Sequence, residues 1–146
     1  MHVARWQLLG ARSDRFPVRI PAVAIVDRPR FAWRGVMLDS ARQYQSPEFI
    51  KHFIDTLALH KLNVLHWHLT DDQGWRIQIK RYPKLTDVGA WRIPASVDSP
   101  PPPRYGGFYT TEQLRDLARY AAEPFVTLVP ADDRPGPAPA APPAPR

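Results

Sequence analysis

The sequence has no cysteine among its 146 residues. Disulfide bonds and metal sites with thiolate ligands are therefore excluded, while the redox state of the compartment is left undetermined. The sequence also has no apolar stretch of the roughly 18 residues that a membrane-spanning helix needs. Residues 1–10 lack the long apolar core of a signal peptide. We predict no membrane segment in this chain and leave its localisation and its oligomeric state open.

The chain has no run of basic residues, although its formal net charge is +6. Its arginines are scattered from Arg5 to Arg146, and no glycine-aromatic RNA-binding signature accompanies them. Proteins that bind nucleic acid typically concentrate their basic residues in one patch or stripe. We therefore predict no nucleic-acid partner and interpret the excess of arginine as solvated surface charge.

Prolines are sparse in the first two thirds of the chain and dense at its end. Thirteen of the 18 lie from Pro94 onward, and residues 137–146 contain only Pro, Ala and a terminal Arg. Such a segment cannot bury a core, so we expect residues 131–146 to form a disordered Pro/Ala-rich tail. Residues 1–29 are interpreted as the remnant of a preceding domain with its linker. The predicted folded unit is residues 30–130.

Within this unit, strand-like apolar segments alternate with helical patterns. The expected strands are residues 31–38, 63–69 and 125–129. Ser46, Pro47 and Glu48 supply an N-cap, a first-turn proline and an early acidic residue for one helix. A capping box from Thr110 to Gln113 begins the other. This order predicts an α/β fold with parallel strands.

A long excursion, residues 71–109, separates the second expected strand from the second helix. It exceeds an ordinary connection, and long loops in such folds are often functional. Residues 75–79 alternate between apolar and polar side chains, so we expect a small hairpin strand there.

Charged residues follow each of the three expected strands. They are Asp39 and Arg42 after the first, Asp71 and Asp72 after the second, and Asp132 and Asp133 after the third. Ligands of parallel α/β folds bind beyond the carboxyl ends of the strands. We therefore predict that these side chains meet at one rim and form a site.

Several of these residues allow two interpretations. The Arg42 guanidinium suits two neighbouring oxygens, either of a carboxylate or of two sugar hydroxyls, but a salt bridge to Asp39 or solvation fits equally. Asp71 is a candidate base, orienting carboxylate or hydroxyl acceptor, and one of Asp71 and Asp72 is expected to cap the loop through its own backbone.

The aromatic neighbours are equally open. His66 and His68 share one strand face, where they either bind a metal with Asp71 or are neutral, hydrogen-bonded interior histidines, the interpretation we favour. Trp75 and Trp91 either stack on sugar rings or pack in a core.

Three segments carry a more specific signal in combination. Residues 33–42 read WRGVMLDSAR, residues 61–76 read KLNVLHWHLTDDQGWR, and residues 105–110 read YGGFYT. Together they resemble the opening of the catalytic domain of glycoside hydrolase family 20, the β-N-acetylhexosaminidases. The resemblance covers roughly residues 17–130.

The resemblance implies a (β/α)8 TIM barrel, of which this chain holds about the first three strands. It implies removal of terminal N-acetylglucosamine or N-acetylgalactosamine from glycans with retention of configuration and without a cofactor or metal. In such enzymes the substrate's own acetamido oxygen attacks the anomeric carbon, one Asp orients the acetamide, and the adjacent Glu is the general acid. The implied partner is an N-acetylhexosamine-containing glycan.

Two site residues carry over by position. Arg42 matches the arginine that binds the 3- and 4-hydroxyls of the sugar, and Asp71 matches a carboxylate in a relay with a histidine and the acid. The chain departs from the family where Pro137 stands at the position of that histidine. It has three glutamates, Glu48, Glu112 and Glu123, all in or beside expected helices, and no adjacent Asp-Glu pair. We therefore expect a catalytically inactive fragment of a glycosidase.

Two other functions remain open at the level of sequence. A metal-dependent hydrolase of the amidohydrolase type also carries a His-x-His pair on a barrel strand. A non-catalytic sugar-binding remnant would retain Arg42 and the tryptophans.

Overall fold

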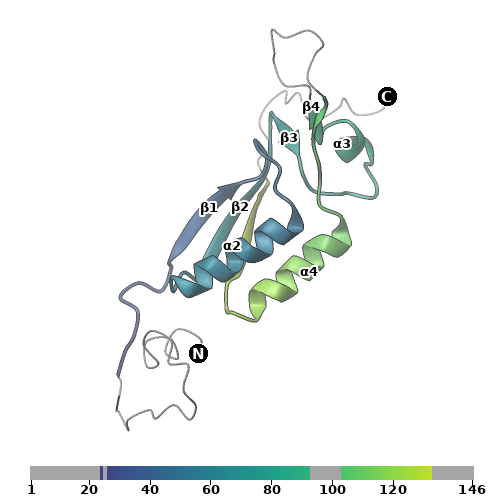
Figure 1. Ribbon diagram of the computed structural model, residues 1–146. Helices are drawn as coiled ribbons and strands as arrows, with labels where there is room; N and C mark the ends of the chain where they lie inside the picture. Colours follow the sequence, from purple (N-terminus) through teal and green to yellow (C-terminus); the bar gives the residue numbers. More distant parts are fainter. Residues whose placement is uncertain (1–23, 25, 93–102, 133–146) are drawn as a thin grey trace, which may run out of the picture.

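The computed structural model of the chain describes residues 24, 26–92 and 103–132, which form an α/β fold (Figure 1). The elements in chain order are β1 (Gly35–Asp39), α2 (Pro47–Leu59), β2 (Val64–Asp71), β3 (Gly74–Trp75), α3 (Lys84–Asp87), β4 (Trp91–Arg92), β5 (Tyr105–Gly106), α4 (Thr111–Ala122) and β6 (Thr127–Asp132). Among the described helices, none is long and apolar enough to cross a membrane.

The main sheet is centred on β2, which pairs in parallel with β1 on one side and β6 on the other. The predicted parallel pairing is thus confirmed. Asp39 lies opposite His68 in the first pairing, and Thr70 lies opposite Asp132 in the second. The short β3 returns antiparallel to the last residues of β2. The carboxyl ends of the three parallel strands therefore meet at one edge.

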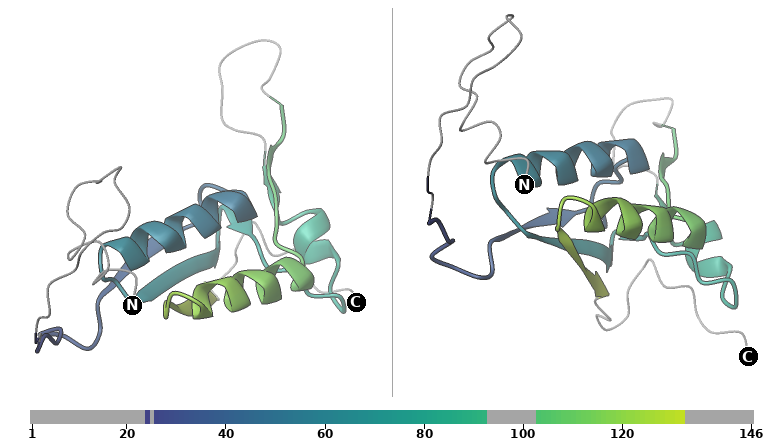
Figure 2. Two further views of the ribbon diagram at one scale, coloured as in Figure 1. Left: turned by 60° about the horizontal axis from the view of Figure 1, so that its bottom comes forward. Right: turned by 90° about the horizontal axis from the view of Figure 1, so that it is seen from below.

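Both long helices cover the same face of this sheet (Figure 2). Side chains of β2 that alternate toward the helices are buried, and they pack on one apolar stripe from each helix. The core comprises Leu65, Trp67 and Leu69 of β2, Ile50, Ile54 and Leu57 of α2, and Leu117 and Ala121 of α4. The opposite face exposes Met37 (54% exposed) and His66.

Both helix starts are those that the sequence predicts. The Ser46 hydroxyl accepts a hydrogen bond from the Phe49 N–H, and Pro47 occupies the first turn of α2. At α4, Thr110 Oγ1 accepts from the Gln113 N–H at 3.1 Å, and Gln113 Oε1 accepts from the Thr110 N–H at 2.9 Å. This reciprocal capping satisfies donors that the helix itself cannot.

The predicted strand limits are wrong at several ends. The first strand begins at Gly35 because Arg34 Nη1 donates to the carbonyls of Phe31 and Ala32, which bends the segment before the strand. The second strand extends to Asp71 because β3 pairs with its end. The third begins at Thr127, because Phe125 adopts a left-handed φ of 61° in the turn after α4. It extends to Asp132, which pairs with Thr70 of β2.

The excursion is more structured than a loop. It contains β3, α3 and an antiparallel β4–β5 pair, with residues 93–102 outside the described residues. The expected hairpin strand over residues 75–79 is wrong in extent, because Arg76 turns into the interior and Ile77 forms only a single bridge with Tyr109. The predicted tail over residues 131–146 is wrong at its start, because Ala131 and Asp132 belong to β6. The rest of that tail and most of the N-terminal segment lie outside the described residues.

Candidate functional site

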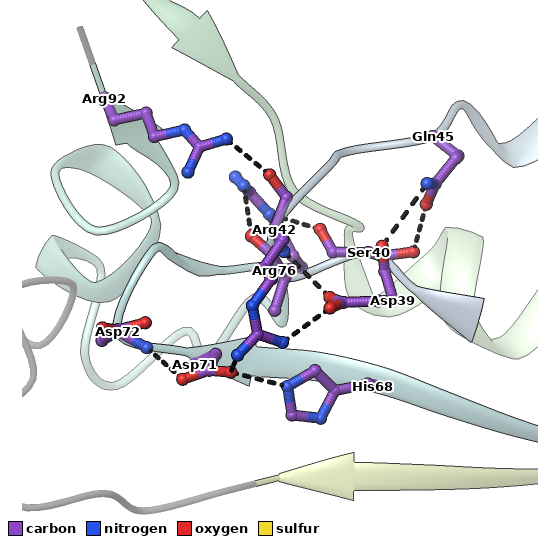
Figure 3. Close-up of polar contacts among 10 residues, drawn as sticks. Asp39, Ser40, Arg42, Gln45, His68, Asp71, Asp72, Arg76 and Arg92 are labelled. Carbon is purple, nitrogen blue, oxygen red and sulfur yellow. Dashed lines mark hydrogen bonds and ion pairs between the residues drawn. The ribbon is translucent and has the colours of Figure 1, made fainter. Parts of the chain in front are cut away.

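The guanidinium of Arg42 is held between the carboxylates of the last residues of two neighbouring strands, Asp39 of β1 and Asp71 of β2 (Figure 3). Its Nη1 lies 2.7 Å from Asp39 Oδ2, and its Nη2 lies 2.6 Å from Asp71 Oδ2. The salt bridge to Asp39 considered from the sequence is present, and a second one accompanies it. The Arg42 side chain remains 54% exposed, so the group is fixed in orientation yet open to a ligand.

Asp71 is engaged through both carboxylate oxygens. Its Oδ1 accepts the Asp72 backbone N–H at 2.7 Å, and its Oδ2 lies 3.1 Å from His68 Nε2 as well as contacting Arg42. The expected loop cap is therefore made by Asp71 itself. The Asp72 N–H, followed by the His68 hydrogen bond and the Arg42 charge, lowers the pKa of Asp71. Asp71 is an anionic acceptor near neutral pH rather than an acid.

Asp39 completes the cluster. Its Oδ1 accepts the backbone N–H of Arg42 at 2.9 Å, in addition to the side-chain ion pair. Burial acts to raise the pKa of Asp39, but the hydrogen bonds and charge of Arg42 outweigh it, and the pKa is lowered. The hydrogen bond to Asp39 in turn raises the pKa of Arg42. All three groups are thus held in their charged forms.

The two histidines differ in environment although they share a strand face. His68 is 8% exposed and contacts Asp71, which fits the interior-histidine interpretation. His66 lies on the same strand face but is exposed, because none of the described elements covers its part of that face. Within the described part of the chain, no three His, Asp or Glu side chains are grouped as metal ligands, so the three-ligand cluster with Asp71 is not formed.

The other predicted rim residues lie around this cluster rather than in it. Asp132, at the end of β6, accepts a hydrogen bond from Thr70 Oγ1 at 2.8 Å. Asp72 is exposed and supplies its backbone N–H to Asp71, while Asp133 lies outside the described residues. The rim therefore brings Asp39, Arg42 and Asp71 together, with Asp132 on the next strand.

Both candidate tryptophans have structural partners. The indole N–H of Trp75 donates to the Ile77 carbonyl at 2.7 Å. The guanidinium of Arg104 lies over the Trp91 ring at 5.1 Å from its centroid. Both rings are half-buried, which favours the packing interpretation over stacking on a sugar.

Two buried polar residues beneath the site, Arg76 and Ser40, are not predicted from the sequence. Arg76 has no exposed surface, and its guanidinium donates only to backbone carbonyls. The Ser40 hydroxyl accepts from Trp67 Nε1 at 2.8 Å and donates to Gln45 Oε1 at 2.6 Å. The only sequence signal for Arg76 is a charged residue within an otherwise apolar alternation, because the partners of its guanidinium come from distant segments.

The cluster can bind neighbouring hydroxyls, but it contains no proton donor suited to catalysis. A general acid needs a raised pKa. Glu48 and Glu112 lie in the first turns of α2 and α4, where backbone hydrogen bonds lower the pKa of each. Glu123 lies at the far end of α4, at its C-cap.

Comparisons with known proteins agree on one family. The family model described as the catalytic domain of glycosyl hydrolase family 20 matches residues 31–144. A β-hexosaminidase of Vibrio furnissii is 46% identical over 143 residues, covering 93% of this chain and 23% of its own length. One from Porphyromonas gingivalis is 48% identical over 140 residues, covering 92% and 17% respectively.

Solved structures show the same similarity. The family 20 exo-β-N-acetylglucosaminidase of Vibrio harveyi, solved with N-acetylglucosamine, is 48% identical and superposes with a TM-score of 0.72. The match covers 80% of this chain and 19% of that one. The chain therefore spans only about a fifth of the length of the relatives it matches.

Proposed function

The chain belongs to glycosyl hydrolase family 20, and on that basis we propose that its β1, β2 and β6 are the first three strands of a (β/α)8 barrel. Their parallel order along the sheet supports this, as does the placement of both helices on one face. The exposed face with Met37 and His66 would become the barrel interior once further strands pair at both edges.

The proposed role of this segment is to form one wall of a pocket for a terminal N-acetylhexosamine. The observation that carries it is the Arg42 guanidinium, which is fixed by Asp39 and Asp71 while half of its side chain stays open. A planar fork in this setting suits two adjacent sugar hydroxyls. Arg42 is the proposed substrate-binding residue.

Asp71 is the proposed supporting carboxylate of the reaction. Its lowered pKa suits a group that orients a neighbouring imidazole and stabilises its cationic form. In the complete barrel the acetamido oxygen of the substrate would attack the anomeric carbon, an acid would protonate the leaving oxygen, and water would then release the sugar with retained configuration. The 146-residue chain contributes binding and orientation but has no Asp-Glu pair for the acid step.

Titration of N-acetylglucosamine into the 146-residue chain, followed by heteronuclear NMR, tests this proposal. We expect weak binding, with a dissociation constant on the order of 1 mM, and shifts concentrated around Arg42 and Asp71. Arg42→Ala should abolish the shifts. Arg119→Ala is the matched control, because this arginine is 80% exposed on α4. Equal shifts in wild type and Arg42→Ala would show that the pocket assignment is wrong.

A further inference from the structure

Every backbone N–H and carbonyl group of residues 40–42 is hydrogen-bonded. The N–H groups of Ser40 and Ala41 both donate to the His68 carbonyl, at 2.9 and 3.2 Å. The N–H of Arg42 donates to Asp39 Oδ1 at 2.9 Å. The three N–H groups of residues 40–42 are therefore bound to the ends of β1 and β2.

The three carbonyls of the same residues all accept from arginines of the excursion (Figure 3). Arg76 Nε donates to the Ser40 carbonyl at 2.9 Å, and Arg76 Nη2 donates to the Ala41 carbonyl at 2.8 Å. Arg92 Nη2 donates to the Arg42 carbonyl at 2.7 Å. Two guanidiniums from residues 71–109 thus bind three consecutive carbonyls.

Arg76 also connects this segment to both described arms of the excursion. Its Nη1 donates to the carbonyl of Ala90, the residue just before β4. The same nitrogen donates to the carbonyl of Gly107, just after β5, at 3.1 Å. Space for this guanidinium depends on Gly74, where a Cβ would lie 2.5 Å from Arg76 Cζ and 2.8 Å from the Ala41 carbonyl oxygen. The rigid planar fork of arginine suits such a set of acceptors, whereas lysine is a flexible point donor.

We propose that Arg76 and Arg92 are positioning residues for Arg42, which fix the main chain of residues 40–42 so that the Arg42 guanidinium rests between Asp39 and Asp71. The excursion would then fix the main chain of the arginine proposed to bind the sugar. Its relevance to sugar binding rests on the proposed function, but the hydrogen bonds themselves do not depend on any ligand.

The decisive variant is Arg92→Ala in the full 146-residue chain. Arg76 is buried, so its removal leaves several carbonyls unsatisfied and threatens folding, whereas the Arg92 bond is exposed. The readout is the pKa of the Asp71 carboxyl, followed by ¹³C NMR titration, because Arg42 contributes to lowering it. Arg42→Ala gives the full rise expected when that contribution is lost.

We expect Arg92→Ala to raise the pKa of Asp71 clearly, in the same direction as Arg42→Ala and by a smaller amount. The titrations are run at about 1 M salt, where the Debye length of about 3 Å screens the charge of Arg92 itself. Arg104→Ala is the matched control, because this excursion arginine donates to the Asp87 carbonyl at 3.0 Å and not to residues 40–42. It should leave the pKa of Asp71 unchanged.

An Asp71 pKa in Arg92→Ala equal to that in wild type and Arg104→Ala would overturn the inference. This titration needs no sugar, so it decides the role of Arg92 whatever the N-acetylglucosamine experiment gives. If wild type shows no chemical-shift changes with N-acetylglucosamine, the proposed function is rejected, but the role of Arg92 is not. A preserved circular dichroism spectrum in each variant confirms that the comparison concerns folded protein.

Discussion

Arg42 Nη2 and Asp71 Oδ2 lie 2.6 Å apart, although Arg42 follows β1 and Asp71 is the last residue of β2. The parallel pairing of β1 with β2 places Asp39 opposite His68, so the segments after both strands begin at the same edge of the sheet. The ion pair is therefore a direct product of strand register. A one-residue slip would turn the side chains of one strand to the other face.

Asp71→Asn should separate the binding role of this carboxylate from its contribution to stability. The amide keeps the size of the side chain but loses the charge that holds Arg42. The arginine of this ion pair is 54% exposed. Pairs open to solvent stabilise by only about 0.2–1 kcal/mol, so unfolding in urea should shift little. N-acetylglucosamine binding, measured by NMR, should weaken severalfold.

The control for this variant is Asp116→Asn, which removes an exposed carboxylate 2.7 Å from Lys51 on the helical layer. It should alter stability to a similar extent and leave sugar binding intact. Equal effects of both substitutions on the sugar response would contradict the role of Asp71.

Acid should weaken the fold through Asp39 and Asp71. The pKa of each is lowered in the folded chain, so each contributes stability above the unfolded-state Asp pKa of about 3.9. That contribution is lost as the pH falls through the lower folded-state values. Urea midpoints measured from about pH 6 down to about pH 2 should therefore decrease. In Arg42→Ala the decrease should be shallower, and an identical profile would argue against this coupling.

Arg76→Met should unfold much of the described structure. The substitution retains apolar bulk but removes the arginine donor of the Ser40, Ala41 and Gly107 carbonyls. The Ala90 carbonyl keeps only the Gly107 N–H. An unsatisfied buried polar group costs about 1–3 kcal/mol, so the sum is a large part of the stability of a small domain. Circular dichroism in urea measures the loss. Arg119→Met, at an exposed position, should be nearly neutral, and a neutral Arg76→Met would show that water replaces the guanidinium.

Thr110→Ala should destabilise the chain by about 1 kcal/mol through loss of the α4 cap. The hydroxyl accepts from the Gln113 N–H, and that donor has no partner within the first turn of the helix. The urea midpoint measures the effect. Thr111→Ala, one residue into the helix, is the matched control and should be close to neutral, and equal losses in the two variants would show that the cap is not the cause.

The 146-residue chain should give no turnover of a chromogenic N-acetylglucosaminide above the blank without enzyme. The physical reason is the missing acid, since both first-turn glutamates have lowered pKa values. The exo-β-N-acetylglucosaminidase of Vibrio harveyi serves as the positive control. Turnover by the chain that disappears in Glu48→Gln would show that the acid is present after all.

Local signals in the sequence were sufficient for the two long helices and for the parallel sheet, but not for the short α3. The caps at Ser46 and Thr110 act within a few residues, and the apolar stripes report directly on the buried face. The strand ends were not predictable in the same way. Phe125 has the composition of a strand residue, but the turn from α4 into β6 forces it into a left-handed conformation.

The site was predictable only in part for a related reason. Position after a strand was enough to bring Arg42 and Asp71 forward as candidates. The buried Arg76 was missed because a charged residue is normally taken as surface, and its acceptors are separated from it by up to 36 residues. The different environments of His66 and His68 likewise depend on which neighbours cover each end of one strand face.

The hydrogen-bonded main chain of residues 40–42 has a thermodynamic consequence for any ligand of Arg42. A flexible arginine loses much of its rotational freedom when it binds, and this loss opposes association. Here the fork between Asp39 and Asp71 has already been ordered by folding, so any ligand meets a preorganised group. The entropy of ordering this side chain is lost on folding and not on binding. Less of the favourable enthalpy of each new hydrogen bond to a ligand is therefore offset by lost entropy.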